Sequence, residues 1–105
     1  MSRDPLYLYV RDPIEGDRVV AVRATSQLGR DLTCDVVVGD AEASRRHAEL
    51  VAEPGGRWQL RDLDSTNGTF VNDRRVVGAV DVAAGDVVRI GRVSVELHSA
   101  DPTPQ

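Results

Sequence analysis

Short β-branched segments, each ended by a turn signal, are the feature that most constrains this fold. Segments rich in Val, Ile, Leu and Tyr occur at 6–10, 18–23, 36–38, 48–53, 58–61, 70–71, 74–77, 87–90 and 93–98. Between them, roughly every 8–12 residues, lie turn-forming stretches with Pro-Gly, Asn-Gly, Asn-Asp or Gly-Asp pairs. No stretch keeps a helical period of apolar residues over three turns. The pattern predicts an all-β protein, either a sandwich or a barrel.

The size and composition of the chain limit what it can be. Its 105 residues give room for one domain with one core, and its 41% hydrophobic content is that of a folded chain. No apolar run approaches the roughly 20 residues of a membrane helix, so we expect no membrane insertion. The first residues lack an apolar signal-peptide stretch, and the one cysteine, Cys34, suits a reducing compartment. We therefore expect a cytoplasmic protein or domain.

The charge balance excludes several classes of function. The net charge of −4 argues against a general nucleic-acid binder or a protein that binds anionic membranes. All 13 basic residues are Arg, so the chain has no Walker-type P-loop, Schiff-base lysine or lysine general base. If it binds phosphate, it must use guanidinium groups, hydroxyls and backbone N–H groups. Guanidinium groups suit this role because they bind phosphate through paired, directional hydrogen bonds.

Residues 62–72 form the most informative stretch, a polar turn between two strand-like pieces. Asn67-Gly68 is a strong turn signal, because both residues accept a positive φ at low cost. Asp64, Ser65 and Thr66 can bond to nearby backbone and stiffen the loop. Such a loop can present hydrogen-bond donors to a ligand. Taken alone, it is equally compatible with an ordinary hairpin.

Two further segments change this interpretation. Gly29-Arg30 ends an apolar-containing run, and Ser44-Arg45-Arg46-His47 directly precedes a strand-like segment. Together with the 65–69 segment Ser-Thr-Asn-Gly-Thr, in this order, they resemble the forkhead-associated (FHA) family of phosphothreonine-recognition domains. The resemblance covers roughly residues 6–98. It implies a β-sandwich of about eleven short, mostly antiparallel strands with its ligand loops at one end. Residues 1–5 would be an N-terminal extension and residues 99–105 a C-terminal tail or the start of a linker.

The resemblance also implies a role for each motif residue. Residues that match phosphopeptide contacts are Arg30, Ser44, Arg45, Thr66 and Asn67, and those that match structural support of the site are Gly29, His47, Ser65 and Gly68. Adjacent residues of an extended segment point in opposite directions, so one of the two neighbouring arginines at 45 and 46 faces solvent. We expect Arg45 to face the ligand.

Two positions depart from the usual family pattern. Asp73 stands where a Gly is common after Val-Asn, although Asp tolerates the backbone conformations that such a turn needs. Gly39 stands where an acidic residue is frequent, next to the ligand loops. Neither change removes an expected phosphate contact, but Gly39 is expected to alter loop geometry or peptide preference.

The expected function is that of a signalling adaptor, a module that recognises phosphothreonine in substrates of Ser/Thr kinases. It would be a monomeric domain that binds no nucleic acid and needs no cofactor. The alternative is a sandwich that binds a partner without phosphate, through the same loops or a sheet face. An enzyme using Ser44, His47 and Asp62 as a triad is disfavoured, because nothing resembles a nucleophile elbow. Two His and one Cys, widely spaced, make no metal site.

Overall fold

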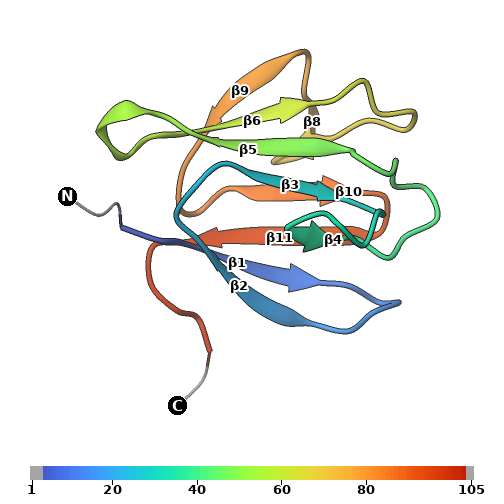
Figure 1. Cartoon of the computed structure of the whole chain (residues 1–105), viewed down its shortest axis with the longest axis horizontal. Helices are drawn as coiled ribbons and strands as arrows, with labels where there is room; N and C mark the ends of the chain where they lie inside the picture. The colour runs from blue at the N-terminus through green and yellow to red at the C-terminus, as the bar shows by residue number, and fades with distance from the viewer. Residues whose placement is uncertain (1–3, 104–105) are drawn as a thin grey trace.

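The computed structural model describes residues 4–103, which form eleven strands and one short 3-10 helix (Figure 1). The elements are β1 (Leu6–Arg11), β2 (Arg18–Val22), β3 (Ser26–Gly29), β4 (Val36–Val37), β5 (Ala48–Ala52), η1 (Pro54–Gly56), β6 (Trp58–Asp62), β7 (Phe70–Val71), β8 (Arg74–Arg75), β9 (Ala79–Val82), β10 (Val87–Ile90) and β11 (Val93–His98). No described helix is long and apolar enough to cross a membrane.

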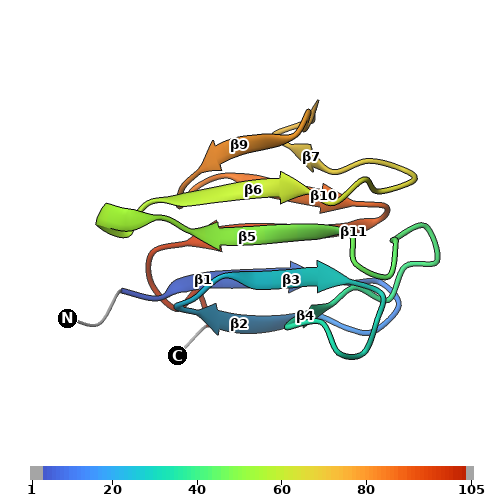
Figure 2. The ribbon, with the colours of Figure 1, turned by 45° about the horizontal axis from the view of Figure 1, so that its top comes forward.

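The strands form two sheets that pack face to face, as the turned view in Figure 2 shows. Sheet A has the order β2-β1-β11-β10-β7-β8, and sheet B has the order β4-β3-β5-β6-β9. Every pair in the two sheets is antiparallel except β3 with β4. The prediction of an all-β sandwich of about eleven short, mostly antiparallel strands is therefore confirmed.

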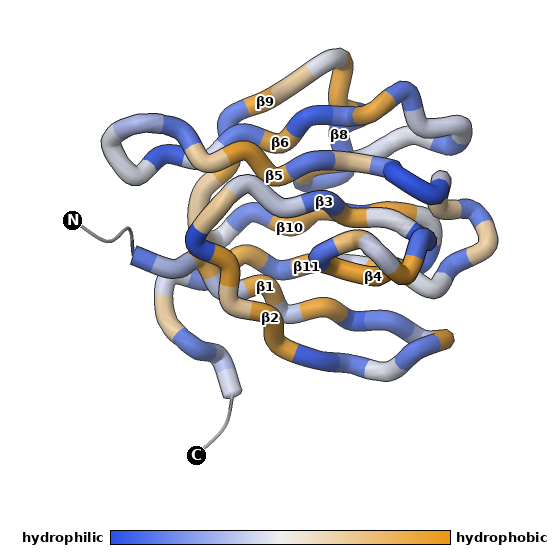
Figure 3. The backbone as a smooth tube through the Cα atoms, in the orientation of Figure 1, coloured by the Kyte–Doolittle hydropathy of each residue, from blue (hydrophilic) through white to orange (hydrophobic). Residues whose placement is uncertain are grey.

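Alternation of apolar and polar residues builds the core between the sheets, and it is visible as colour changes along the strands in Figure 3. In sheet A, Leu8 pairs with Leu97 and Val10 with Val95, and all four side chains are buried. Their neighbours along each strand point to the outer face, because side chains alternate along a strand. Full burial of one such side chain stabilises the fold by about 1.5–3 kcal/mol.

One predicted strand is clearly shorter in the structure, and two observed strands, β3 and β9, were not among the predicted segments. The strand expected at 74–77 ends at Arg75, because Val76 turns into the core and Val77 is 89% exposed. Strand β9 was missed, because only Val82 of its four residues is buried and the segment therefore lacks an apolar alternation. The turn between β7 and β8 has positive φ at both Asn72 (49°) and Asp73 (67°). Asp73 thus adopts the backbone conformation that a Gly would otherwise supply.

The connections divide between two ends of the sandwich (Figure 1). One end, here named the loop end, carries the β1–β2, β3–β4, β4–β5, β6–β7 and β10–β11 connections. The other, here named the terminal end, carries the β2–β3, β5–β6 and β9–β10 connections and both ends of the described chain. All the motifs singled out in the sequence lie at or next to the loop end.

Candidate functional site

Segment 44–47 of the β4–β5 connection is held against the end of β3 by its main chain. The N–H of Arg30 donates to the carbonyl of Ser44 (3.0 Å), and the N–H of His47 donates to the carbonyl of Leu28 (2.9 Å). A Cβ on Gly29 would lie only 2.1 Å from the carbonyl oxygen of Arg45. Only glycine allows this approach, so Gly29 shapes the site.

His47 joins the two main loops of this end through its ring. The side chain is fully buried; Nδ1 accepts the N–H of Ser44 (3.0 Å), and Nε2 lies 2.9 Å from the carbonyl oxygen of Gly68. A ring that accepts at Nδ1 and faces a carbonyl at Nε2 must carry its proton on Nε2. Both nitrogens are thus engaged with main-chain atoms, and His47 has no nitrogen left to accept a proton from the Ser44 hydroxyl.

Three groups at this end keep hydrogen-bond donors that no group of residues 4–103 accepts. The Ser44 hydroxyl oxygen accepts the N–H of Thr66 (3.1 Å), which leaves its proton for another acceptor. Arg30 donates from Nε to the carbonyl of Ala43 (3.1 Å), so its two terminal nitrogens have no acceptor within residues 4–103. The Thr66 hydroxyl likewise forms no hydrogen bond in that part of the chain. The site therefore offers several hydrogen-bond donors and one fixed positive charge.

The neighbouring arginines 45 and 46 differ in their surroundings. Arg46 extends toward β3, where Nη1 donates to Oε1 of Gln27 (3.4 Å). The guanidinium of Arg45 has no hydrogen bond or ion pair within the described residues, whereas its carbonyl accepts the N–H of Asp31 (3.1 Å) and the thiol of Cys34 (3.3 Å). The Arg45 side chain is therefore the more available of the two.

Asp62 organises the β6–β7 loop. Its carboxylate accepts the hydroxyls of Ser65 (2.6 Å) and Thr69 (2.7 Å) and the N–H of Ser65 (3.2 Å). Ser65 in turn accepts the N–H of Gly68 (3.1 Å), so its hydroxyl serves the loop itself. Burial alone would raise the pKa of Asp62, but these hydrogen bonds lower it below its ordinary value. Asp62 belongs to the loop scaffold and makes no hydrogen bond to the His47 ring.

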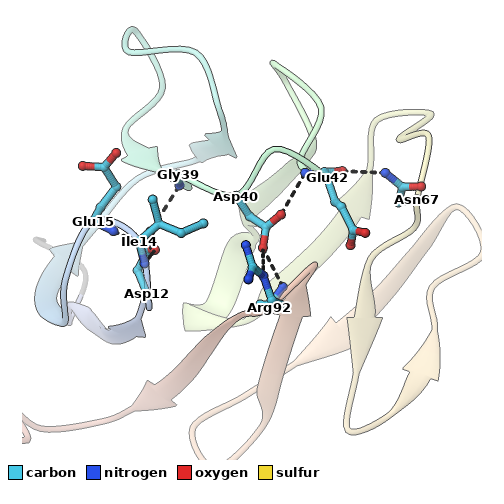
Figure 4. A network of polar contacts seen from close by, with 8 residues as sticks. All are labelled: Asp12, Ile14, Glu15, Gly39, Asp40, Glu42, Asn67 and Arg92. Atoms are coloured by element: carbon cyan, nitrogen blue, oxygen red, sulfur yellow. Dashed lines mark hydrogen bonds and ion pairs between the residues drawn. The ribbon is translucent and has the colours of Figure 1, made fainter.

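Asp40 ties the β4–β5 connection to the β10–β11 turn and, through Glu42, to Asn67 (Figure 4). Its buried carboxylate accepts the N–H of Glu42 (2.8 Å), the N–H of Arg92 (3.0 Å) and Nε of Arg92 (3.1 Å). The two N–H bonds are the main reason why the pKa of Asp40 is lowered. The carbonyl of Glu42 then accepts Nδ2 of Asn67 (2.8 Å), which leaves the amide oxygen of Asn67 as the open acceptor.

The Asp12 carboxylate joins the β1–β2 turn to the start of the β4–β5 connection. Its carboxylate accepts the N–H groups of Ile14 (2.8 Å), Glu15 (3.0 Å) and Gly39 (3.1 Å). Burial would raise the pKa of Asp12, but these bonds and the charge of Arg18 lower it overall. A Cβ on Gly39 would lie 2.3 Å from Cγ of Glu15. The absence of a side chain at Gly39 thus admits Glu15 of the β1–β2 turn beside the β4–β5 connection (Figure 4).

The five residues predicted to contact a phosphopeptide all lie on connections of the loop end. Direct hydrogen bonds join the Ser44 and Thr66 segments, and a carbonyl from the β4–β5 connection anchors Asn67. Sequence reasoning missed the scaffold carboxylates Asp12 and Asp40. No group of His, Cys, Asp or Glu side chains within residues 4–103 is arranged to hold a metal ion.

Comparisons with known proteins agree with this arrangement. The FHA domain family model matches residues 27–91. The chain is 41% identical over 91 residues to the glycogen accumulation regulator GarA of Mycolicibacterium smegmatis, an alignment that covers 87% of this chain and 56% of GarA. This chain therefore spans just over half the length of that relative.

Two solved structures share the fold over nearly the whole chain. One comes from a structural and functional analysis of phosphothreonine-dependent FHA domain interactions, with a TM-score of 0.78 and 32% identity over 94% of this chain and 99% of that one. Mycobacterium tuberculosis EmbR, in complex with a low-affinity phosphopeptide, has a TM-score of 0.78 and 30% identity over 94% of this chain and 26% of EmbR. The family model, the identity and the shared fold agree, and the chain belongs to the FHA domain family.

Proposed function

We propose that this chain is a phosphothreonine-dependent protein-interaction module, which binds phosphorylated segments of Ser/Thr-kinase substrates through the loop end. The family consists of interaction modules rather than enzymes, and the chain itself carries out no catalysis. Its related structures include one studied for phosphothreonine-dependent interactions and one bound to a phosphopeptide.

The observation that carries the proposal is a set of unused donors on a scaffold that is already held in shape. The Ser44 hydroxyl is fixed by Thr66, and the Arg30 side chain is fixed at Nε, yet both keep donors for a ligand. A rigid, preformed site loses little conformational entropy on binding, so more of the interaction energy appears as affinity.

A phosphothreonine fits this set of groups chemically. It carries about −1.5 to −2 charges and three strong acceptor oxygens at neutral pH. Arg30, Arg45, Ser44 and Thr66 would satisfy those oxygens through charge-assisted bonds worth roughly 1.5–3 kcal/mol each before ordering costs. The amide oxygen of Asn67 would accept a main-chain N–H of the peptide beside the phosphothreonine. Gly29, His47, Ser65 and Gly68 would support these contacts without touching the phosphate.

The remaining parts of the proposal concern extent and location. We assign the module to residues 6–98, because β1 begins at Leu6 and β11 ends at His98. Residues 1–5 and 99–105 would be extensions, parts of which lie outside the described residues. A cytoplasmic location suits the single cysteine, Cys34, which has no partner for an internal disulfide.

The test is a binding titration with one peptide in phosphothreonine, phosphoserine and unphosphorylated forms. We expect the phosphothreonine form to bind, the phosphoserine form to bind more weakly and the unphosphorylated form not to bind. The missing methyl is worth about 0.8 kcal/mol by transfer, which is roughly fourfold in Kd. A larger difference would mean that the methyl also orients the phosphate.

Substitutions then assign the contacts. We expect Arg30→Ala, which removes two potential charge-assisted bonds, to reduce phosphopeptide affinity at least about a hundredfold, and Ser44→Ala, which removes one, to reduce it roughly 10- to 150-fold. Arg23→Ala is the matched control, since Arg23 is exposed just after β2 at the terminal end. Equal affinity for phosphorylated and unphosphorylated peptides would contradict the proposal and support phosphate-independent binding.

A further inference from the structure

A row of five side chains crosses the outer face of sheet A next to the loop end. Arg75 of β8 pairs with Phe70 of β7, Phe70 with Arg89 of β10, Arg89 with Ser94 of β11, and Ser94 with Arg11 of β1. Directly paired residues project from the same face of a sheet. On β1, β7, β10 and β11 the alternate positions are buried in the core, so the row projects outward there, and Arg75 lies on the same face because it pairs with Phe70. It is named the arginine row.

A solvated sheet face usually carries side chains of both charges. The arginine row instead presents positive charges and one aromatic ring. The three arginines are exposed, and the Arg89 guanidinium lies 4.4 Å from the centre of the Phe70 ring. Arg11 is paired with Glu96 at 2.6 Å. Arg75 and Arg89 form no ion pair with any residue of 4–103. Two uncompensated charges therefore stand on a chain whose net charge is −4.

The arginine row begins at the β6–β7 loop of the proposed phosphopeptide site. A Cβ on Gly68 would lie 3.0 Å from Nε and 3.1 Å from Cζ of Arg75, so the Arg75 side chain rests against this glycine. Gly68 directly follows Asn67, the residue expected to bond the peptide main chain. A peptide held at Asn67 therefore has the first arginine of the row beside it.

The dimensions of the row fit a short extended segment. Adjacent strands lie about 4.8 Å apart, so the five strands place Arg75 about 19 Å from Arg11. An extended peptide covers that distance with about six residues at roughly 3.3 Å each. Arginine and aromatic side chains are the types enriched where protein partners bind most strongly. The charge of the row selects an acidic partner.

We propose that the arginine row is an extension of the phosphopeptide site and binds acidic residues that flank the phosphothreonine in the same partner chain. The proposal rests on the proposed function and adds a substrate preference to it. The Phe70 ring holds the Arg89 guanidinium by a cation–π contact, which reduces the conformational freedom lost on binding. Arg75 and Arg89 supply the two free charges.

The size of the effect follows from the exposure of the row. An exposed ion pair contributes about 0.2–1 kcal/mol, so two such pairs together change Kd by roughly two- to thirtyfold. Because the charges face water, added salt screens them within about 10 Å at 0.1 M ionic strength. The preference should therefore decline as salt is raised.

The experiment compares two phosphothreonine peptides that differ only in their flanks, which are either Glu-rich or Gln-rich. We expect the wild-type chain to bind the Glu-rich peptide about tenfold more tightly at low salt. The double variant Arg75→Gln/Arg89→Gln should lose that gain and keep its affinity for the Gln-rich peptide. Arg89→Gln alone should lose part of the preference for the Glu-rich peptide. Because Arg89 does not touch the β6–β7 loop glycine, this variant distinguishes the charge of the row from any effect of Arg75 on that loop.

The matched control is Arg23→Gln, which removes one exposed arginine from the other end of the molecule. It should leave the preference within about twofold of wild type, because its charge is largely screened at that distance. An undiminished preference in the double variant, or none in the wild type, would overturn the role of the row. Absence of binding to both peptides by the wild type would instead contradict the proposed function and, with it, this extension. Unchanged thermal unfolding of the variants establishes that they are folded.

Discussion

The loop end and the terminal end of the sandwich are stabilised in different ways. At the loop end, the buried or half-buried side chains of Asp12, Asp40, His47 and Asp62 all bond main-chain or hydroxyl groups. The terminal end uses short turns, such as Pro54–Gly56. It also contains an open hollow of about 730 Å³, lined by residues 4–7, 56–58, 81–84, 86 and 99–101.

The difference shows what a recognition surface requires of its scaffold. Long connections have few apolar side chains to bury, so they hold a single shape only if their backbone groups find internal partners. Buried carboxylates supply strong acceptors for several N–H groups at once. The loop end thus relies on specific polar contacts for its shape. A substitution that removes one of these contacts tests the difference between the two ends.

The largest expected effect comes from adding one methyl group at each end. Gly29→Ala at the loop end places a Cβ 2.1 Å from the carbonyl oxygen of Arg45. We expect it to lower the free energy of unfolding by about 3 kcal/mol or more, because backbone must move. At the terminal end, Gly85 has a φ of 101° and nothing within 4 Å of an added Cβ. Gly85→Ala should cost only the backbone strain, about 1–2 kcal/mol. Urea titrations measure both, and equal losses would contradict the contrast.

A smaller effect is expected from Asp40→Asn. The amide has one acceptor oxygen, so its NH₂ group must face an N–H of Glu42 or Arg92. An unsatisfied buried group costs about 1–3 kcal/mol of stability. Because Glu42 anchors Asn67, we also expect phosphopeptide affinity to fall about fivefold, or roughly 1 kcal/mol. Calorimetric titration and thermal unfolding measure the two effects separately.

A double-mutant cycle with Asn67→Ala separates positioning from general loosening. If Asp40 acts through Asn67, Asp40→Asn should change affinity little when Asn67 is already absent. The matched control is Asp86→Asn at the terminal end, where the half-buried carboxylate accepts the N–H of Ala83 and Nδ2 of Asn72. It should leave phosphopeptide affinity unchanged. Additive losses for Asp40 and Asn67 would show that Asp40 only stabilises the fold.

The smallest expected effect is the acid dependence of stability. The folded-state pKa values of Asp12, Asp40 and Asp62 are lowered, so the unfolded chain binds more protons in acid. The stability that these carboxylates contribute is fully present above their unfolded-state pKa of about 3.9. It is lost as the pH falls through their lower folded-state pKa values. Each group adds at most about 1.4 kcal/mol per pH unit to the slope of the free energy of unfolding against pH. Unfolding titrations between pH 6 and pH 2.5 should show a shallower decline for Asp40→Asn than for wild type. Identical slopes would mean that Asp40 is not a source of this dependence.

The fold was largely predictable because local sequence patterns mark most of its strands. Alternating apolar residues and turn pairs mark most strands, and the buried Trp58 and Leu60 occupy one face as their spacing indicates. Strand β9 was not recognisable, since three of its four side chains face solvent and its place is set by pairing with β6. Such tertiary context overrides a weak local pattern.

The site was predictable for residues that carry short motifs and not for residues that support them at a distance. Asp62 lies within the motif and bonds residues three and seven positions later. Asp40 reaches Arg92, 52 residues further along the chain, and nothing local in the sequence marks that contact. A carboxylate followed closely by a turn, as at Asp12 and Asp40, was the one available signal.

The anchoring of Asn67 has a consequence for the chemical lifetime of the molecule. Asn-Gly is a sequence prone to spontaneous deamidation, in which the nitrogen of the glycine attacks the side-chain amide carbon of the asparagine. Here the N–H of Gly68 donates to Ser65, and Nδ2 of Asn67 donates to the carbonyl of Glu42. Both reacting groups are held in other contacts, so ring closure requires the loop to open first. The hydrogen bonds that shape the loop therefore also slow the deamidation of Asn67.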